Sequence, residues 1–356
     1  MKKLFFFIAG GCFAPALILA QETAPETEKP KPVFTFSADA YYKYDLNKSS
    51  FNNRTSFTNS HNSFELGMAS VKAEHTIGKV GMVADIGFGK RAEDFSYNDD
   101  KSRFALKQLY LSYSPWKNFK FTAGSWATHV GYELVDAYAN RNYSMSYMFS
   151  YGPFFHTGLK GELTVGKSGF MLGIANPTDL KSTTFGPKFL LGQYSTSLAN
   201  DALKLYLNLH AGKFNDSTKL NQLDLVLSQA ISSKFNIGFN GTIASTKVKD
   251  NGKYGESNEW WGSAIYLNAD PKSWLGLTLR TEYFSDKQQL NVFNPALVAA
   301  GGNVLAATIS ANFKIDNLTI IPEFRIDNAS EPIFFKSSGS QVKSASNVLI
   351  AAVYKF

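Results

Sequence analysis

The sequence predicts an all-β protein: a transmembrane up-and-down antiparallel β-barrel of about 16 strands, with short periplasmic turns and long extracellular loops. In the stretch LKLYLNLH, residues 203–210, leucine occupies every odd position and a residue with a polar atom every even position. This period of two is typical of a strand with one apolar face. The pattern recurs from about residue 33 to the last residue, and short and long connections alternate between its repeats.

One alternating strand would fit a soluble β-sandwich equally well, so the rest of the chain decides between the two folds. No second set of strands is available for a separate core, and no run of about 18 apolar residues indicates a transmembrane helix. Only helices and closed barrels pair every backbone polar group within lipid. We therefore expect the leucines to face lipid and the polar residues to face a lumen.

The N-terminus has the features of an export signal. Lys2 and Lys3 precede an apolar stretch, and a second apolar patch ends at Ala20. We expect residues 1–20 to be a signal peptide of the secretory pathway, 21–32 a flexible periplasmic leader, and 33–356 a barrel in the outer membrane of a Gram-negative bacterium. Cys12, the one cysteine, would leave with the signal. The alternative is a lipoprotein signal, since residues 9–12 loosely resemble a lipidation site.

The charge balance excludes some classes of partner. The chain has 36 basic and 29 acidic residues, and removing Lys2 and Lys3 lowers the net charge from +7 to 34 − 29 = +5. The basic residues are scattered among acidic ones, whereas nucleic-acid binding needs them on one face. We expect no nucleic-acid partner and, at most, a mild preference of a pore for anions.

The expected elements follow one another with a regular rhythm. The first strand covers about 34–45 and leads into a long loop at 46–62, and the second ends at the short turn 77–79. The third strand, 80–90, opens into a loop at 91–103, and the fourth closes at the turn 115–118. Further short turns are expected at 166–168, 199–201, 232–234, 269–273 and 315–317, and further loops at 129–152, 177–187, 215–218, 247–257, 286–302 and 328–345. An even strand number puts both termini on the short-turn side.

Alternation predicts which side chains face lipid. For example, Leu223 is expected to face outward and Asp224 inward. The pattern fails in the second strand, where Leu66 and Met68 share parity with charged residues, so we expect a β-bulge or a partly apolar lumen. Aromatic residues near strand ends are expected to form girdles at the membrane interfaces: Trp116, Phe119, Trp260, Trp261, Trp274, Tyr283 and Phe284.

Residues 129–152 depart from the strand pattern. This stretch is too long for a tight loop, and loops of such length are uncommon unless functional. It contains Glu133, Asp136, Tyr138 and Arg141, which could set a transverse field and a size limit if the loop folds back into the lumen. We expect these residues to narrow a pore. The alternative is an ordinary external loop packed by its own tyrosines.

Thirteen residues between positions 124 and 158 follow an order and spacing that are typical of one protein family. They are Gly124, Thr128, Gly131, Glu133, Asn140, Tyr143, Ser144, Ser146, Phe149, Pro153, His156, Thr157 and Gly158. This set resembles the OmpL-like outer-membrane β-barrel porin family (putative β-barrel porin 2). In that family the position between the two serines is often arginine, whereas here it is Met145. The resemblance implies an outer-membrane porin, and it assigns no binding residue.

Three candidate chemical sites have weaker support in the sequence. Residues 161–168, GELTVGKS, match a phosphate-binding pattern, but that motif needs a helix after it, and a strand and a turn follow here. The five histidines sit at unrelated spacings, so no metal site and no cofactor are expected. Asn142, Ser144 and His156 form the one nearby set that would suit a barrel hydrolase.

These features together predict passive diffusion of small hydrophilic solutes through a water-filled lumen, with no enzymatic step. The expected partners are outer-membrane lipids and the barrel assembly machinery, which would recognise the last strand ending in Phe356; a homotrimer is an open expectation. A barrel-anchored surface binding protein, or a barrel hydrolase, is the alternative. The side chains expected to line the pore are His156, Lys160, Glu162, Lys204, Asp224, Arg280, Glu282 and Arg325.

Overall fold

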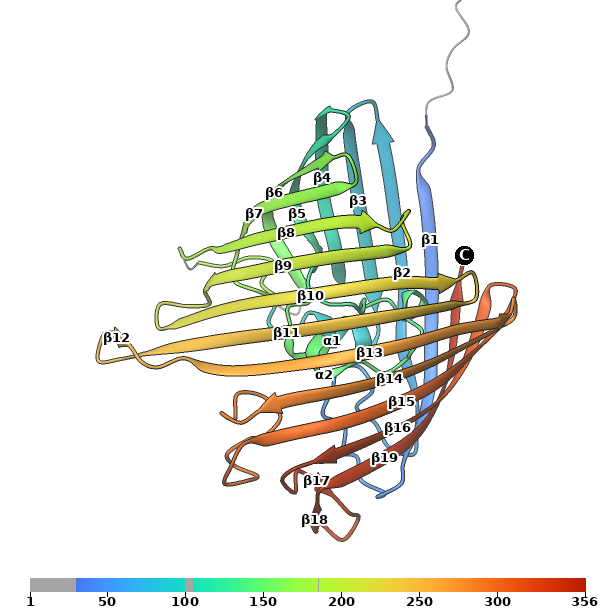
Figure 1. Cartoon of the computed structure of the whole chain (residues 1–356), viewed down its shortest axis with the longest axis vertical. Helices are drawn as coiled ribbons and strands as arrows, with labels where there is room; N and C mark the ends of the chain where they lie inside the picture. The colour runs from blue at the N-terminus through green and yellow to red at the C-terminus, as the bar shows by residue number, and fades with distance from the viewer. Residues whose placement is uncertain (1–29, 100–104, 185) are drawn as a thin grey trace, which may run out of the picture.

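The computed structural model describes residues 30–99, 105–184 and 186–356 (Figure 1). The expected signal peptide, residues 1–20, and residues 21–29 of the expected leader lie outside the described residues. Of the nineteen strands in the described part of the chain, β12, β17 and β18 have two residues each, and the other sixteen form the barrel wall. Their bounds are β1 Val33–Asp45, β2 Ser63–Ile77, β3 Val80–Phe88, β4 Leu106–Trp116, β5 Phe119–Ala127, β6 Phe155–Val165, β7 Ser168–Ala175, β8 Phe189–Leu198, β9 Leu203–Lys213, β10 Thr218–Ser232, β11 Phe235–Asp250, β13 Asn258–Lys272, β14 Leu275–Asp286, β15 Gly302–Ile315, β16 Leu318–Ala329 and β19 Ser344–Lys355.

Neighbouring strands of the wall are all antiparallel, and the pairing of β1 with β19 closes the barrel. The backbone amides of Phe36 and Phe356 donate to each other's carbonyls at 2.9 and 3.0 Å, so the barrel ends meet on the short-turn side. Two of the tight turns need a backbone angle that glycine adopts without strain. Gly78 and Gly166 have φ of 57° and 58° in these turns. The closed, even-stranded barrel predicted from the sequence is confirmed.

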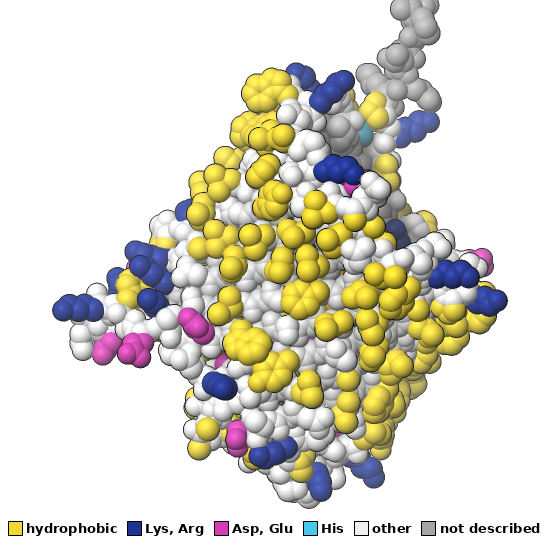
Figure 2. Space-filling view, viewed as in Figure 1, with side chains coloured by type: hydrophobic (Ala, Val, Ile, Leu, Met, Phe, Trp, Pro, Cys, Tyr) yellow, Lys and Arg dark blue, Asp and Glu magenta, His cyan; other side chains and the backbone are white. Residues whose placement is uncertain are grey.

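The outer surface carries a broad band of apolar side chains across the strands (Figure 2). Along β10 the exposed Leu223 alternates with buried Asp224, as expected. Neither helix of the described residues, α1 (Lys90–Phe95) or α2 (Tyr147–Tyr151), is long and apolar enough to span a membrane. The alternation in β10 places its apolar side chains on the outer surface and its polar ones in the interior, as in a transmembrane barrel.

The predicted irregularity in β2 is a β-bulge at Gly67. Asp39 pairs with Met68 and Ala40 with Leu66, so Gly67 is the extra residue. The bulge reverses the alternation: Leu66 is 79% exposed on the outside and Met68 only 2% exposed inside. A Cβ at position 67 would lie 1.7 Å from a carboxylate oxygen of Asp39, so a larger residue there would have to displace that carboxylate.

The predicted aromatic girdles are partly wrong. Trp116, Trp261 and Trp274 are exposed on the outer surface, but Trp260 and Phe284 are buried in the interior. Trp260 and Trp261 are adjacent, so a strand must turn one of them inward. The inward one packs against residues of the extracellular loops, which supply an apolar environment inside the barrel.

Three of the extracellular loops that pack inside the barrel share one apolar group. The loop 46–62, the loop carrying α1, and the connection between β5 and β6, which contains the 3₁₀ turn Ala137–Ala139 and α2, meet in one apolar group. Figure 1 shows both helices within the outline of the barrel. This group, here called the loop cluster, consists of Phe57, Phe95, Val135, Met145, Phe149, Phe154 and Phe155, all buried.

Candidate pore constriction

The connection between β5 and β6, residues 128–154, crosses the lumen and is here called the inward segment. Local contacts fix its path: the Asn140 side chain accepts from the Leu134 amide at 2.9 Å, and the Ser146 hydroxyl accepts from Phe149 N at 3.2 Å at the start of α2. Gly131, with φ of 94°, permits the bend at which its amide donates to Asp224 on β10. The sequence alternative of an external loop is therefore not what the structure has.

Wall carboxylates hold the middle of the inward segment by its backbone amides. The amides of Tyr143 and Ser144 donate to the two oxygens of Glu323 on β16, at 2.8 and 3.1 Å. The amide of Tyr147 donates to Glu282 on β14 at 2.8 Å. These are charge-assisted bonds to backbone groups that face away from water, so they are stronger than neutral ones.

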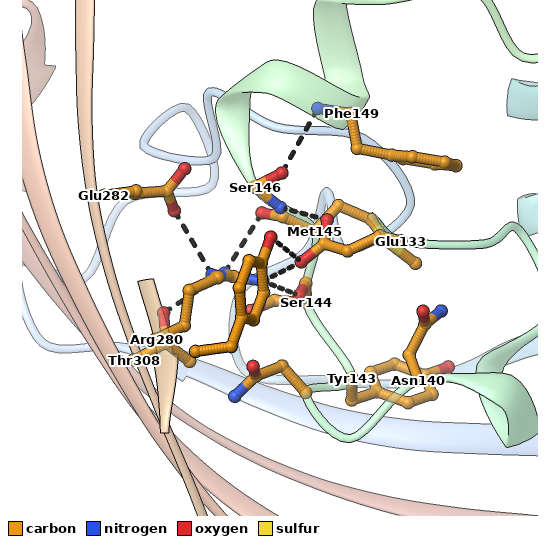
Figure 3. Close-up of polar contacts among 12 residues, drawn as sticks. Glu133, Asn140, Tyr143, Ser144, Met145, Ser146, Phe149, Arg280, Glu282 and Thr308 are labelled. Carbon is orange, nitrogen blue, oxygen red and sulfur yellow. Dashed lines mark hydrogen bonds and ion pairs between the residues drawn. The ribbon is translucent and has the colours of Figure 1, made fainter. Parts of the chain in front are cut away.

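Two wall arginines hold the carbonyls of the same stretch, and Figure 3 shows the contacts of one of them, Arg280. Arg280 on β14 donates to the Ser144 carbonyl at 2.7 Å and to Glu133 at 2.6 Å. The Met145 carbonyl accepts from Arg280 at 3.3 Å and from Arg325 on β16 at 2.7 Å. Residues 143–147 are thus bound through donors and acceptors of the main chain. We call this set of contacts the backbone clamp.

The charges of the clamp compensate one another. Arg280 is fully buried and lies 3.4 Å from Glu282, and Arg325 lies 3.3 Å from Glu282 and 2.8 Å from Asp327. Burying these ions is costly unless each has a partner and satisfied hydrogen bonds. Each of these ions has a counter-charge within 3.4 Å, but Arg280 Nε and one oxygen of Glu282 make no hydrogen bond, so the network depends on all its members being present.

The Met145 side chain points away from the clamp. It is fully buried in the loop cluster with residues of the other two inward-folded loops. The position at which the family often has arginine therefore supplies an apolar anchor by its side chain and a clamp acceptor by its carbonyl.

Asp179, in the loop between β7 and β8, fastens the end of the inward segment. Its carboxylate accepts from the amides of Phe154 and Phe155 at 2.7 and 3.0 Å and from the Tyr97 hydroxyl at 3.3 Å. Burial raises the pKa of Asp179 to about 7, although the backbone donors and Lys181 oppose that shift. This carboxyl links three extracellular loops.

Two cavities lie on opposite sides of the inward segment. The extracellular cavity, about 460 Å³, is lined by residues 150–152 and Phe154 of that segment and by Arg54 and Tyr97 among others. The periplasmic cavity, about 410 Å³, lies near the turns. Its lining residues are Tyr132, Glu133, Ala139, Asn140, Arg141, Asn142, Asn236, Tyr266 and Asn268. The two linings share no residue.

The four expected constriction residues do not face one another across one opening. Glu133 points to Arg280, and Asp136 pairs with Lys107 on β4. Arg141 pairs with Asp270 at the turn side. The last of them, Tyr138, lies 5.1 Å from the Lys355 ammonium. They anchor the inward segment at separate points on the wall.

The expected pore-lining residues all lie on inward-facing positions, but they differ in exposure. His156, Asp224, Arg280, Glu282 and Arg325 are buried. Lys160 and Glu162 are partly exposed and pair at 3.3 Å, and Lys204 is exposed at the turn side.

Sequence reasoning missed several residues that hold the inward-folded loops. Glu323 lies two residues before Arg325 on β16, so strand alternation could have predicted that its side chain also points inward. Arg91 in α1 is fully buried, donates to the carbonyls of Val135 and Tyr143, and lies 4.0 Å from Asp39. Nothing in the linear sequence indicates that α1 enters the barrel.

Three histidines unrelated in spacing are brought together. The ring of His156 lies 5.1 Å from that of His129 and 5.3 Å from that of His210. Across the described residues, no group of three or more His, Cys, Asp or Glu is arranged to hold a metal ion. In the considered hydrolase set, Asn142 donates to Ser310, the His156 ring contacts Thr128, and the buried Ser144 hydroxyl makes no hydrogen bond, so the three side chains are not joined to one another. Residues 161–168 form the end of β6, a turn and the start of β7.

Comparisons with known proteins agree with this architecture. A model of the family described as "Putative beta-barrel porin-2, OmpL-like" matches residues 34–356. No curated protein matches the chain.

Several solved structures share the fold. The outer membrane channel DcaP of Acinetobacter baumannii has 12% identity and a TM-score of 0.62, with 91% of this chain and 97% of that chain covered. A loop-deletion mutant of OmpT from Vibrio cholerae has 11% identity and a TM-score of 0.63, with coverage of 92% and 99%. An anion-selective porin from Comamonas acidovorans has 12% identity and a TM-score of 0.61, with coverage of 92% and 99%. At these identities the likeness concerns the fold.

Proposed function

This chain belongs to the putative beta-barrel porin-2, OmpL-like, family of outer-membrane porins, and from that membership we propose how solutes cross it. Small hydrophilic solutes diffuse passively through the lumen, and the inward segment sets the size limit. Solutes move between the extracellular and periplasmic cavities, which lie on either side of this segment.

The observation that supports this proposal most is the backbone clamp. Segment 143–147 is held by Glu323, Glu282, Arg280 and Arg325, so its place in the lumen does not depend on its own side chains alone. A fixed obstacle in a wide barrel leaves narrow passages beside it, and these admit solutes by size.

Selectivity for charge is expected to be weak. The buried charges of the clamp occur in pairs, as do Lys160 with Glu162 and Arg141 with Asp270. A path lined by paired charges, amides and hydroxyls has little net field along it, so hydrated ions of both signs and neutral solutes pass through it without an ion being bound on the way.

The assembly of the porin is part of the proposal. We place the chain in outer-membrane lipid after secretory export, with the strand ending at Phe356 as the element that the barrel assembly machinery recognises. A homotrimer is the proposed state, supported by the solved trimer form of OmpT from Vibrio cholerae, which shares the fold.

The test is single-channel conductance of the refolded protein in a planar bilayer. A deletion within residues 135–145 is compared with a matched deletion in the external loop 251–257, which lies far from the clamp (Figure 1). We expect discrete open steps that grow when residues 135–145 are shortened and stay unchanged with the control. Absence of steps from a heat-modifiable, folded barrel would contradict the channel.

One observation favours a second function. The loop cluster fills part of the barrel with apolar side chains, three of which are Phe57, Phe95 and Met145. A barrel closed by its own loops would serve as an anchor for a surface binding protein. The same bilayer experiment separates the two, because an anchor gives no steps with or without the deletion.

A further inference from the structure

The periplasmic cavity combines features that go beyond a passage for solutes. At about 410 Å³ it falls in the ~300–1,000 Å³ range of small-molecule sites. It is bounded on one side by the inward segment and on the other by β11 and β13, which carry Asn236 and Asn268. Both sides are therefore fixed by the barrel wall or by the clamp.

The charges at this cavity are already neutralised. Glu133 accepts from Arg280 at 2.6 Å, from the Ser146 amide at 2.8 Å and from the Tyr266 hydroxyl at 3.3 Å. Arg141 pairs with Asp270 at the rim. A charged solute would have to give up its own hydration without gaining an unpaired counter-charge, so hydrated ions can pass through the cavity but are not bound in it.

The remaining polar groups are amides and hydroxyls with capacity left over. The Tyr132 hydroxyl accepts from Asn268 at 3.3 Å, which leaves its own hydrogen to donate. Asn142 donates its amide to Ser310 at 2.7 Å, which leaves its carbonyl oxygen to accept. Asn236 and Asn268 are joined at 3.2 Å and hold each other in place. The Tyr132 hydroxyl as donor and the Asn142 carbonyl as acceptor therefore line the same cavity, on side chains that other hydrogen bonds hold in place.

Two tyrosines give the cavity an apolar wall. The rings of Tyr132 and Tyr266 are stacked at 4.1 Å with an angle of 20° between their planes. Tyr132 also lies against β11 at Gly238, where a Cβ would come within 2.7 Å of its ring. A stacked, immobile aromatic pair offers apolar area at little cost in side-chain entropy.

We propose that the periplasmic cavity is a binding site for a neutral, ring-shaped polyhydroxylated solute of the sugar class. The hydroxyls of such a solute both donate and accept, which matches Tyr132 and Asn142, and its carbon faces pack on the tyrosine wall. This assignment rests on the proposed porin function, because the ligand is the solute that the channel passes.

The test is calorimetric titration of the full-length, refolded barrel in detergent. Glucose and sucrose are the sugar probes, glycine and acetate the charged probes, and a polyethylene glycol of similar size the neutral probe without a ring. We expect measurable binding of at least one sugar and none of the other three compounds. Sugar binding no tighter than that of acetate or the glycol would overturn the proposal.

Two variants and a matched control locate the site. Tyr132→Phe removes only the hydroxyl group and keeps the ring, and Asn268→Leu replaces the amide by an apolar side chain of similar size; each should weaken sugar binding by roughly threefold to tenfold. Asn59→Leu changes an amide of the extracellular cavity and should leave binding unchanged. Heat-modifiable mobility verifies that each variant is folded. Equal sugar affinity in all three variants and the wild type would place binding elsewhere and refute the site.

Conductance of the same preparations separates this inference from the porin function. Open channel steps without sugar binding would refute the sugar site and leave the porin standing. Sugar binding without channel steps would support the site and contradict free diffusion through the barrel.

Discussion

Replacing Arg280 should release the inward segment from the wall. Arg280 is fully buried and donates to Glu133, to the carbonyls of Ser144 and Met145 and, at 3.2 Å, to the Thr308 hydroxyl. The variant Arg280→Met keeps most of the side-chain length but removes every one of these bonds. Removing one partner of a buried ion pair costs about 3–5 kcal/mol, because the other charge stays buried and uncompensated.

That cost falls on the docked state of the inward segment. A loss of 3–5 kcal/mol lowers the ratio of docked to undocked segment by a factor of about 10²–10⁴. We therefore expect larger and noisier single-channel steps from Arg280→Met in a planar bilayer. The matched control is Arg141→Met, which removes an arginine of the segment itself. Its ion pair with Asp270 is about one-third exposed, so the loss should stay below about 1 kcal/mol.

A double variant identifies the cause. Glu282 keeps its ion pair with Arg325 in Arg280→Met, whereas Glu133 loses its arginine; neutralising that carboxylate in the double variant with Glu133→Gln should therefore recover part of the effect. The reasoning would be refuted if Arg280→Met conducted like the wild type, or if Arg141→Met changed the steps equally.

Three further predictions concern the supports of the loops and wall. The pKa of Asp179 is about 7 in the folded barrel and near 3.8 in the unfolded chain, so between these pH values the folded barrel holds a proton that the unfolded chain has lost. The free energy of unfolding should therefore fall as pH rises from about 4 to 7, by at most ~4 kcal/mol. Urea titrations should show that Asp179→Asn flattens this dependence, and an unchanged slope would disprove the assignment. Met145→Ala should destabilise the docked segment by about 2–5 kcal/mol through a cavity in the loop cluster, seen as increased current noise; quiet channels would contradict it. Gly67→Ala should lower the yield of folded barrel, since its Cβ would overlap Asp39, and a normal yield on heat-modifiable gels would show that the bulge adapts.

The strands and turns were predictable because each depends on local pattern. The alternation of leucine with polar residues predicts β9, and Gly166 predicts the hairpin between β6 and β7, in both cases without knowing which strands pair with them. Even the β2 bulge was visible, since Leu66 and Met68 broke parity with the rest of their strand. Trp260 was placed wrongly because alternation alone does not decide which of two adjacent tryptophans turns inward.

The clamp could not be derived from the sequence, for a physical reason. Its bonds join backbone atoms of residues 143–147 to Glu323 and Arg280, more than 130 positions away, and backbone groups leave no residue-type signature. The inward entry of α1 is equally hidden: Phe95 and Arg91 resemble ordinary loop residues until the loop cluster forms around them. The charged residues at 133, 136 and 141 indicated that this loop enters the barrel, but the sequence did not indicate which strand of the wall each of them would contact.

The docking of the inward segment against the β15–β16 wall is the central claim, and a disulfide tests it most directly. Asn142 on the segment donates to Ser310 on β15 at 2.7 Å, and the one cysteine of the chain, Cys12, lies in the expected signal peptide. Oxidation of a mature Asn142→Cys, Ser310→Cys variant should give a nearly complete cross-link. A control pair, Asn142→Cys with Asn208→Cys on β9, should remain reduced. Failure of the first pair to cross-link, or equal cross-linking of both, would contradict the docked segment.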